Sequence, residues 1–389
     1  MFGKKEKERL KWSLLIIYGL TNTFEQWCRI LLPFTQWQLE PRPSLFDSLI
    51  LNCIGNTSMV LGSFFIAQLI DTIGGKPAAI ISTIVIGLYQ IVISNIHNYY
   101  FFGLCETLLF FNHMPTIVEA LIGQLIGEDG DDKERSRILM RLIIPASIAF
   151  AAGPYLAVQA LYLITPSLAL SQSLCGVLNL LTVLPIVIFA LPTPNQQSKK
   201  FQIPTIVSAP YNAYDQVLRT QLSTQMLTNP GDMAKLGLLL GIFTIVSNIF
   251  ILPRLQQRFG PQTLLLGALT ILFCCYIYLS WVHEYMYLLF GLPLQIMGVC
   301  VANGLLTAQL MGEVPRVHMG KAAALNRIAQ LAATSMTPLI AGHYIDGSET
   351  AILCYTSAGI TLLGIPLIFY KGKFMRHHFS NLPIRTHEE

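Results

Sequence analysis

Long apolar segments recur along the whole chain, and they constrain its fold more than any other feature. A helix that crosses the hydrocarbon core of a membrane needs about 20 consecutive, mostly apolar residues. Eleven segments of the 389-residue chain meet this requirement: 12–32, 47–70, 77–97, 100–126, 138–163, 168–191, 236–253, 262–282, 286–310, 322–345 and 350–370. The pattern predicts an all-α protein that crosses a lipid bilayer many times.

The charge content supports a lipid environment and excludes one class of partner. Asp, Glu, Lys and Arg make up 12% of the residues, against roughly 25% in soluble domains. So few charges cannot cover the surface of a soluble protein of this size. The basic residues stand at the ends of apolar segments and form no continuous basic face, so we expect no nucleic-acid partner.

The sequence also repeats itself at an offset of 184 to 186 residues. Four pairs of landmarks share this offset: Gln124-Leu-Ile-Gly-Glu128 with Gln309-Leu-Met-Gly-Glu313, Gly74 with Gly260, Arg141 with Arg327, and Pro154 with Pro338. The chain therefore consists of two related halves, and duplicated halves are a known construction of membrane transporters.

The duplication suggests a domain organisation. We expect an N-terminal transmembrane bundle in residues 1–192 and a C-terminal bundle in residues 233–371, joined by a central cytoplasmic loop with a degenerate seventh span in 193–232 and followed by a tail in 372–389. Lys and Arg collect in cytoplasmic loops. The basic flanks of the apolar segments therefore place both termini in the cytoplasm.

The seventh span is the weak point of the duplication. The first apolar segment should reappear near residues 198–218, but that stretch is polar and contains two prolines and Asp215. A cytoplasmic tail nevertheless requires an odd number of crossings in this region. Either a degenerate seventh span exists here, or the chain has lost most of one.

Several short motifs resemble those of a known family. The segment Ala67-Gln-Leu-Ile-Asp71-Thr-Ile-Gly74-Gly-Lys76 is similar to the Gly-x-x-x-Asp-Arg-x-Gly-Arg-Lys loop of the major facilitator superfamily, with Asp71, Gly74 and Lys76 matching. Gly153-Pro154 resembles a fragment of that superfamily's antiporter motif. Within the superfamily, Asn22-Thr-Phe-Glu25 and His113-Met-Pro115 resemble the organic-cation-transporter-like solute carriers related to tetracycline:proton antiporters.

The resemblance implies an architecture and a function. It implies two pseudo-symmetric six-helix bundles, here with the seventh helix degenerate or missing, and alternating access about a site near the membrane midplane. It implies a secondary transporter, coupled to protons, whose solute is a small organic cation or drug-like molecule. It also implies that Asp71, Gly74 and Lys76 form a conformational latch at the cytoplasmic face. The alternative is a non-transporting membrane scaffold or regulatory relative that has lost a functional seventh span.

The first apolar segment holds two charged residues deep inside it. Glu25 precedes Arg29 by one helical turn. Ionisable groups within a membrane are costly and mark functional sites by default, so Glu25 is a candidate proton or cation site. The alternative is an i,i+4 ion pair in which Arg29 only neutralises Glu25.

The fourth apolar segment holds a second candidate pair. Glu106 and His113 are seven residues apart, which places them on one face of a continuous helix. A buried carboxylate can carry a proton and histidine titrates near neutrality, so the pair could relay protons. The alternative is a hydrogen bond that only packs helices together.

Other polar residues within the segments receive simpler interpretations. Gln295 and Asn303 lie on one side of the apolar segment 286–310 and could bind the solute, or could join helices by hydrogen bonds. Glu119 is interpreted as interfacial. Arg141 and Arg327 lie near the ends of their segments, so we expect them to snorkel to the cytoplasmic surface.

The sequence also lacks the motifs of several chemistries. The cysteines have no zinc-site spacing, and the acidic cluster in residues 128–132 lacks the spacing of a calcium-binding loop. The chain contains no phosphate-binding loop and no nucleophile elbow. We therefore expect no metal, no cofactor and no enzyme activity.

Overall fold

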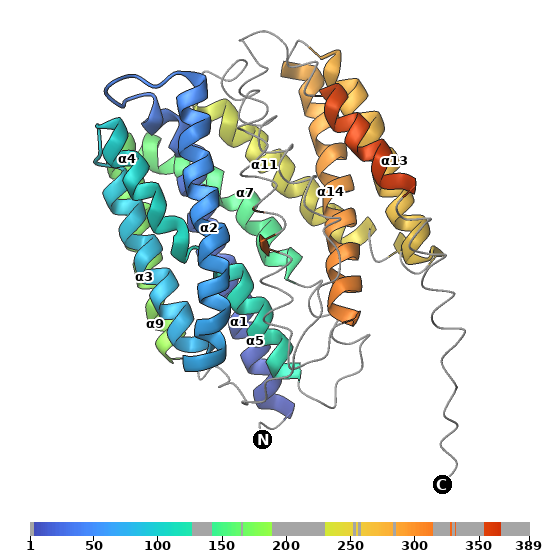
Figure 1. Cartoon of the computed structure of the whole chain (residues 1–389), viewed down its shortest axis with the longest axis horizontal. Helices are drawn as coiled ribbons and strands as arrows, with labels where there is room; N and C mark the ends of the chain where they lie inside the picture. The colour runs from blue at the N-terminus through green and yellow to red at the C-terminus, as the bar shows by residue number, and fades with distance from the viewer. Residues whose placement is uncertain are drawn as a thin grey trace.

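The structure is a computed structural model that describes residues 4–126, 142–164, 166–188, 230–251, 254–255, 258–282, 285–313, 327–328, 331 and 354–366. Regular structure in these ranges is helical, apart from a single bridge between Glu40 and Asn98. Figure 1 shows the helices standing side by side in two groups, one from each half of the chain.

The first half supplies the helices of the first six apolar segments. They are α1 (Lys4–Gln36), α2 (Leu45–Ile73), α3 (Gly75–Ile93), α4 (Tyr99–Glu106), the 3-10 helix η1 (Thr107–Phe111), α5 (Met114–Ile126), α7 (Ile143–Gln159), the π-helical turn η2 (Ala160–Ile164), α8 (Leu168–Leu181) and α9 (Val183–Ile188). The expected segments therefore correspond to helices throughout this half.

The second half is described in fewer pieces. Its helices are α11 (Pro230–Val246), the π-helical turn η3 (Ser247–Ile251), α13 (Pro261–Ser280) and α14 (Tyr285–Glu313), with a further helical stretch at 354–366. The expected seventh span, most of the apolar segment 322–345 and the tail at 372–389 lie outside the described residues. The proposed domain limits and the state of the seventh span therefore stay predictions.

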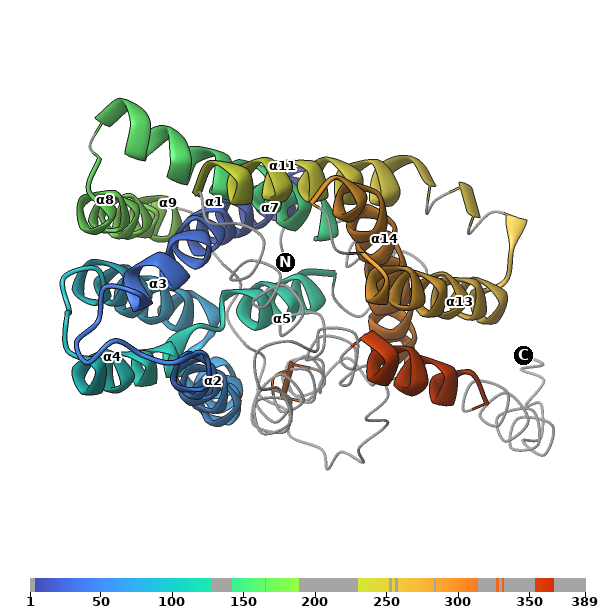
Figure 2. The same ribbon diagram turned by 90° about the horizontal axis from the view of Figure 1, so that it is seen from above.

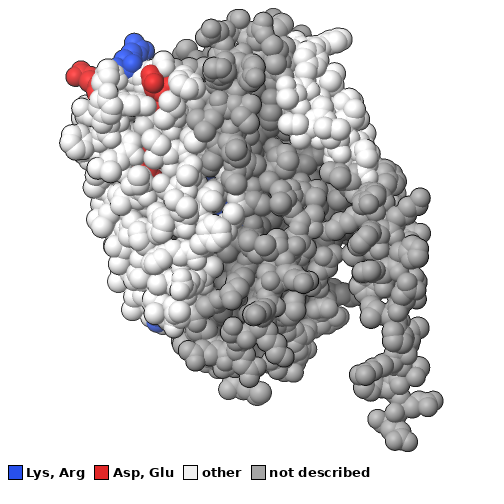
Figure 3. Space-filling view, viewed as in Figure 1, with Lys and Arg blue, Asp and Glu red and all other residues white. Residues whose placement is uncertain are grey.

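The helices have the length and surface of membrane-spanning segments. Among the described residues, six helical stretches are long and apolar enough to cross a bilayer. Large apolar side chains cover the outside; Leu61 and Phe64 of α2, for example, are 59% and 58% exposed. In Figure 3 the described surface is free of charged side chains over most of its height, and the charged groups gather mainly at its ends. Lipid is the solvent that accommodates such a surface.

Each half has its own apolar core. Two clusters of buried residues lie in the first half, one around Leu14 and Ile117 and one around Trp27 and Phe102. Two more lie in the second half, around Tyr276 and around Leu305. Within the described part of the chain, no cluster combines residues of both halves, as expected for two separate bundles.

The two groups of helices meet along α7 and α11, which lie side by side in Figures 1 and 2. Gly237 of α11 faces Pro154 of α7, and a Cβ at Gly237 would lie 2.8 Å from Cγ of that proline. A Cβ at Gly241 would overlap the backbone nitrogen of Ala151. Small residues four apart allow two helix backbones to approach closely without an apolar driving force.

The fourth apolar segment is not one continuous helix, contrary to what its sequence suggested. α4 passes into the tighter η1, and the helix stops at Asn112 and His113 before α5 begins. The carbonyl of Phe111 accepts hydrogen bonds from the backbone N–H of His113 at 2.9 Å and from Oγ of Ser82 at 2.6 Å. Backbone groups at a break inside a membrane need such partners, and here α3 supplies one.

Candidate functional site

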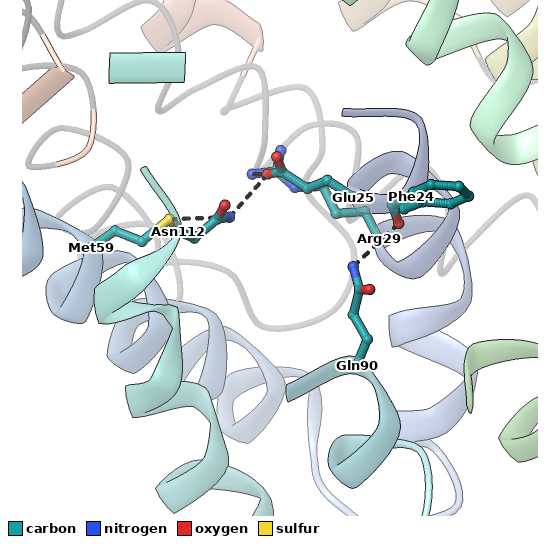
Figure 4. A network of polar contacts seen from close by, with 6 residues as sticks. All are labelled: Phe24, Glu25, Arg29, Met59, Gln90 and Asn112. Atoms are coloured by element: carbon teal, nitrogen blue, oxygen red, sulfur yellow. Dashed lines mark hydrogen bonds and ion pairs between the residues drawn. The ribbon is translucent and has the colours of Figure 1, made fainter. Parts of the chain in front are cut away.

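A charged pair on α1 forms the centre of the polar interior. Oε1 of Glu25 lies 2.9 Å from a terminal nitrogen of Arg29, and the two side chains are 15% and 38% exposed. Nδ2 of Asn112, at the break in the fourth segment, donates to the same oxygen at 3.2 Å. Figure 4 shows Asn112 between Met59 and the Glu25 carboxylate. The i,i+4 ion pair that the sequence left as an alternative is therefore formed.

A chain of amide groups continues from α1 across the first bundle. Nε2 of Gln90 on α3 donates to the carbonyl of Phe24 at 3.4 Å (Figure 4). Nδ2 of Asn179 on α8 donates to Oε1 of Gln90 at 3.2 Å. The thiol of Cys175 donates to the carbonyl of Phe24 at 3.1 Å. These hydrogen bonds between buried groups connect α1, α3 and α8, and such a network favours one relative position of the three helices.

A small cavity of about 10 Å³ lies beside these groups, which is room for about one water molecule. Seven of its ten lining residues are polar, and the ten come from α1, α3, the break before α5, the first turn of α5, and α8: Thr21, Asn22, Glu25, Ser82, Thr83, Ile86, Asn112, Met114, Pro115 and Asn179. The cavity is therefore lined by helices that are far apart in the sequence.

Glu106 is separate from that cavity. It is 1% exposed, and Tyr89 of α3 donates its hydroxyl to Oε1 of Glu106 at 3.1 Å. Oε2 faces α2, where a Cβ at Gly55 would lie 2.5 Å away. The carboxylate thus lies inside the first bundle between α2, α3 and α4.

His113 also faces α2, one heptad further along. Its Nδ1 lies 3.4 Å from Oγ of Ser63, and a Cβ at Gly62 would lie 2.7 Å from its Nε2. That Nε2 is buried and has no hydrogen-bond partner. Glu106 and His113 therefore share a face although the helix between them is broken, and their role as a proton relay stays a prediction.

Arg327 lies in the second half of the chain. Its position in the structure differs from the cytoplasmic surface position that we expected from the sequence. Its Nε is buried and lacks a hydrogen-bond partner, so it does not snorkel to the surface. It interacts electrostatically with Glu25 and Arg29 and also with Tyr18 and Glu119. Glu119, interpreted from sequence as interfacial, is thus part of the same set of charges. An electrostatic interaction between an arginine and the carboxylates of other segments has no local sequence signal, because only the fold brings these residues together.

Gln295 and Asn303, the candidates in the apolar segment 286–310, both lie on α14. Gln295 is fully buried, whereas Asn303 is partly exposed. Both interact with other groups of the protein. That Gln295 or Asn303 contacts a solute stays a prediction.

No protein-family profile and no curated protein sequence matches the chain. Solved structures do match its three-dimensional fold. The human organic anion transporter MFSD10 matches with a TM-score of 0.72 and 15% identity, over 92% of this chain and 99% of that one. The E. coli fucose:proton symporter FucP matches with a TM-score of 0.68 and 13% identity, over 92% and 98%. A mutant of the nucleoside transporter NupG matches with a TM-score of 0.65 and 14% identity, over 93% and 99%.

The chain has the major facilitator fold. The superfamily resemblance of the sequence motifs is thereby confirmed at the level of the fold. One pair of landmarks of the internal repeat lies at equivalent places among the described helices. Gly74 precedes α3 and Gly260 precedes α13, the helices of the apolar segments 77–97 and 262–282.

The major facilitator loop motif forms a tight junction between α2 and α3. Gly74 has φ 98° and ψ 163°, a backbone conformation that is essentially restricted to glycine. Lys76 donates to the carbonyl of Val187 at the end of α9 at 2.7 Å. Asp71 lies in the last turn of α2, and its side chain is outside the described atoms. Gly74 therefore allows the tight junction between α2 and α3, and the role of Asp71, Gly74 and Lys76 as a latch stays a prediction.

Proposed function

We propose that this protein is a secondary transporter that moves a small organic solute across a membrane by alternating access. One observation carries the proposal: the chain has the fold of solved transporters, and that fold brings Arg327 of the second half into electrostatic range of Glu25 and Glu119 of the first half. Uncompensated charges within a bilayer are costly. A shared set of charges between two bundles is therefore a place where a solute or ion can bind and change how the bundles fit together.

The packing between the bundles supports alternation. α7 and α11 meet through Gly241 and Ala151 with little side chain between the two backbones. The buried apolar clusters stay within each half. Two rigid bundles with separate cores can rock about such a contact, as in other transporters with duplicated halves.

We further propose the solute and the coupling ion that the sequence resemblance implies, an organic cation and a proton. Glu25, Glu106 and His113 are the candidate proton-binding groups, because all three lie inside apolar segments. Arg29 already neutralises Glu25. A cationic solute at this position would therefore compete with Arg29 for the carboxylate.

Uptake into proteoliposomes tests the proposal. Purified protein is reconstituted with an imposed pH gradient, and uptake of radiolabelled tetraethylammonium is compared with uptake of the organic anion p-aminohippurate. We expect cation uptake that depends on the gradient, and at least about a tenfold lower rate for Glu25→Gln, which corresponds to one lost charge-assisted contact. The control is Glu40→Gln, because Glu40 is exposed in the loop between α1 and α2.

The outcomes separate the alternatives. Uptake of the anion but not of the cation would leave a transporter and overturn the solute class. A Glu25→Gln variant with the parent's rate and pH dependence would overturn the coupling role. Gradient-independent leakage alone, together with a tag at position 225 that is accessible from the cytoplasm, would favour the non-transporting scaffold.

A further inference from the structure

The helix α1 begins before the apolar segment that it contains. The apolar segment starts at residue 12, whereas α1 starts at Lys4, at one end of the first bundle (Figure 1). At 1.5 Å per residue, residues 4–11 lengthen the helix by about 12 Å. These eight residues, called here the basic extension, therefore continue a membrane-spanning helix without a break.

The basic extension concentrates positive charge. It holds five of the chain's 25 Lys and Arg residues and only two acidic residues, which gives it a net charge of +3. One of the acidic residues, Glu8, forms an ion pair with Lys11 at 2.9 Å inside the extension itself. Arg9 is exposed. A basic cluster directly beside a membrane-spanning helix attracts anionic lipid headgroups.

The exposed face of α1 connects this charge to the apolar surface of the bundle. Arg9, Trp12, Ile16 and Leu20 follow one another at intervals of three or four residues, so they lie along one side of the helix. Trp12, Ile16 and Leu20 are 60%, 58% and 40% exposed. Tryptophan gathers at the level of the lipid headgroups. Arg9 therefore stands one turn beyond an interfacial ring, where a phosphate group is found.

The buried side of α1 fixes this orientation. Leu10, Leu14 and Ile17 are at most 6% exposed and belong to the apolar core of the first bundle. These side chains hold the helix against its neighbours. The exposed face of α1 therefore stays turned toward the lipid.

We propose that this end of α1 binds an anionic phospholipid of the surrounding bilayer. The phosphate lies against Arg9 and the rest of the basic extension, and an acyl chain lies along Trp12, Ile16 and Leu20. Arginine binds a phosphate through two N–H groups at once, and long basic side chains reach headgroup depth with their charged ends. A zwitterionic lipid offers the same acyl chains without a net negative charge, so the basic extension selects the anionic lipid.

The inference is independent of the proposed function. Glu25 lies nine residues after Ile16 on α1, which is half a turn away around the helix. The lipid and the proposed solute therefore use opposite sides of α1, and lipid binding is measured without transport.

Quenching of tryptophan fluorescence by lipid tests the contact. The full-length protein is reconstituted into vesicles of phosphatidylcholine with a small fraction of phosphatidylglycerol. Bromine is carried on the acyl chains of the phosphatidylglycerol or of an equal amount of the phosphatidylcholine, so that the composition stays constant. The emission lost in Trp12→Phe isolates the signal of Trp12. Trp281→Phe isolates the control, because Trp281 is 74% exposed and the chain has no Lys or Arg between Arg258 and Arg316.

The expected result is a local preference for the anionic lipid. At Trp12 we expect phosphatidylglycerol to be favoured over phosphatidylcholine at least about tenfold, because several basic residues act on one headgroup. At Trp281 we expect equal quenching by the two brominated lipids. Added salt should weaken the preference at Trp12, since mobile ions screen exposed charges.

Matched charge variants locate the headgroup. Arg9→Gln should lower the preference at Trp12 about fivefold, which corresponds to one basic residue lost near the membrane surface. Arg42→Gln is the control, because Arg42 is also exposed but lies between α1 and α2, at the other end of α1. It removes the same charge from the protein and should leave the preference unchanged.

Three results would overturn the proposal. Equal quenching of Trp12 by the two brominated lipids would show ordinary contact with the bulk bilayer. Equal losses in Arg9→Gln and Arg42→Gln would show a general effect of net charge with no site on α1. A stronger preference at Trp281 than at Trp12 would place the anionic lipid elsewhere on the protein.

Discussion

Tyr89 donates its hydroxyl to Oε1 of Glu106 across 3.1 Å, and this hydrogen bond joins α3 to α4 inside the first bundle. Both residues are buried, at 4% and 1% exposure. Glu106 is not among the residues that line the small cavity. The two acids of the first bundle are therefore separately placed, Glu25 beside the cavity and Glu106 among α2, α3 and α4.

Removing the hydroxyl of Tyr89 should destabilise the protein. Tyr89→Phe leaves Glu106 buried without this donor, so we expect the free energy of unfolding to fall by about 1–3 kcal/mol. Thermal unfolding in detergent measures the change. Tyr99→Phe is the control, because its hydrogen bond to Asp47 is longer, at 3.4 Å, and Tyr99 is less buried.

A double-mutant cycle isolates the contact between these two groups. Tyr89→Phe should cost less when Glu106 is already Leu, because the acceptor of the hydrogen bond is then absent. Additive effects of the two substitutions would show that the hydrogen bond contributes no coupling energy.

The contact between α7 and α11 should not tolerate a methyl group. In Gly241→Ala the new Cβ would overlap the backbone of Ala151, which cannot move aside as a flexible side chain could. We expect a loss of about 1–3 kcal/mol from this overpacking. Gly267→Ala in α13 is the matched control, because nothing lies within 4 Å of its Cβ position. That substitution should stabilise, since alanine favours a helix over glycine by about 1 kcal/mol. Equal midpoints for the two variants would contradict the prediction.

The backbone conformation at Gly74 should not tolerate a residue with a side chain. At φ 98° and ψ 163° a side chain is strained, so Gly74→Ala should cost about 1–3 kcal/mol. The repeat supplies the comparison: Gly260 has φ −67° and open space around its Cβ position. Gly260→Ala should therefore cost less. A thermal-unfolding comparison in which Gly260→Ala is the more damaging would rule this reason out.

The charges shared between the halves should depend on one another. We expect Arg327→Met and Glu119→Gln each to lower the unfolding midpoint, because each leaves the charge of the other less compensated. The double variant should recover part of that loss, which a double-mutant cycle measures. Uptake by the double variant should stay low if Arg327 contributes to the solute site. Strict additivity of the two midpoint changes would show that the residues do not interact.

Local patterns along the chain predicted most of the helices. Apolar segments of about 20 residues corresponded to α1–α5, α7–α9, α11, α13 and α14, since hydrophobicity over a window is a property of neighbouring residues. The i,i+4 geometry of Glu25 and Arg29 was also available, because both lie on one helix. Gly74 could be assigned to a turn because it lies between the apolar segments 47–70 and 77–97.

What the sequence alone determined was therefore the class of the protein: apolar helices, their order, their duplication, and the polar residues carried within them. The tertiary structure decided which of those polar residues meet. It broke the fourth segment at Asn112, brought Arg327 into electrostatic range of Glu25, and assembled a cavity with Asn179. These relationships join helices far apart in the chain, and they arise because polar groups removed from water must find partners wherever the packing brings them.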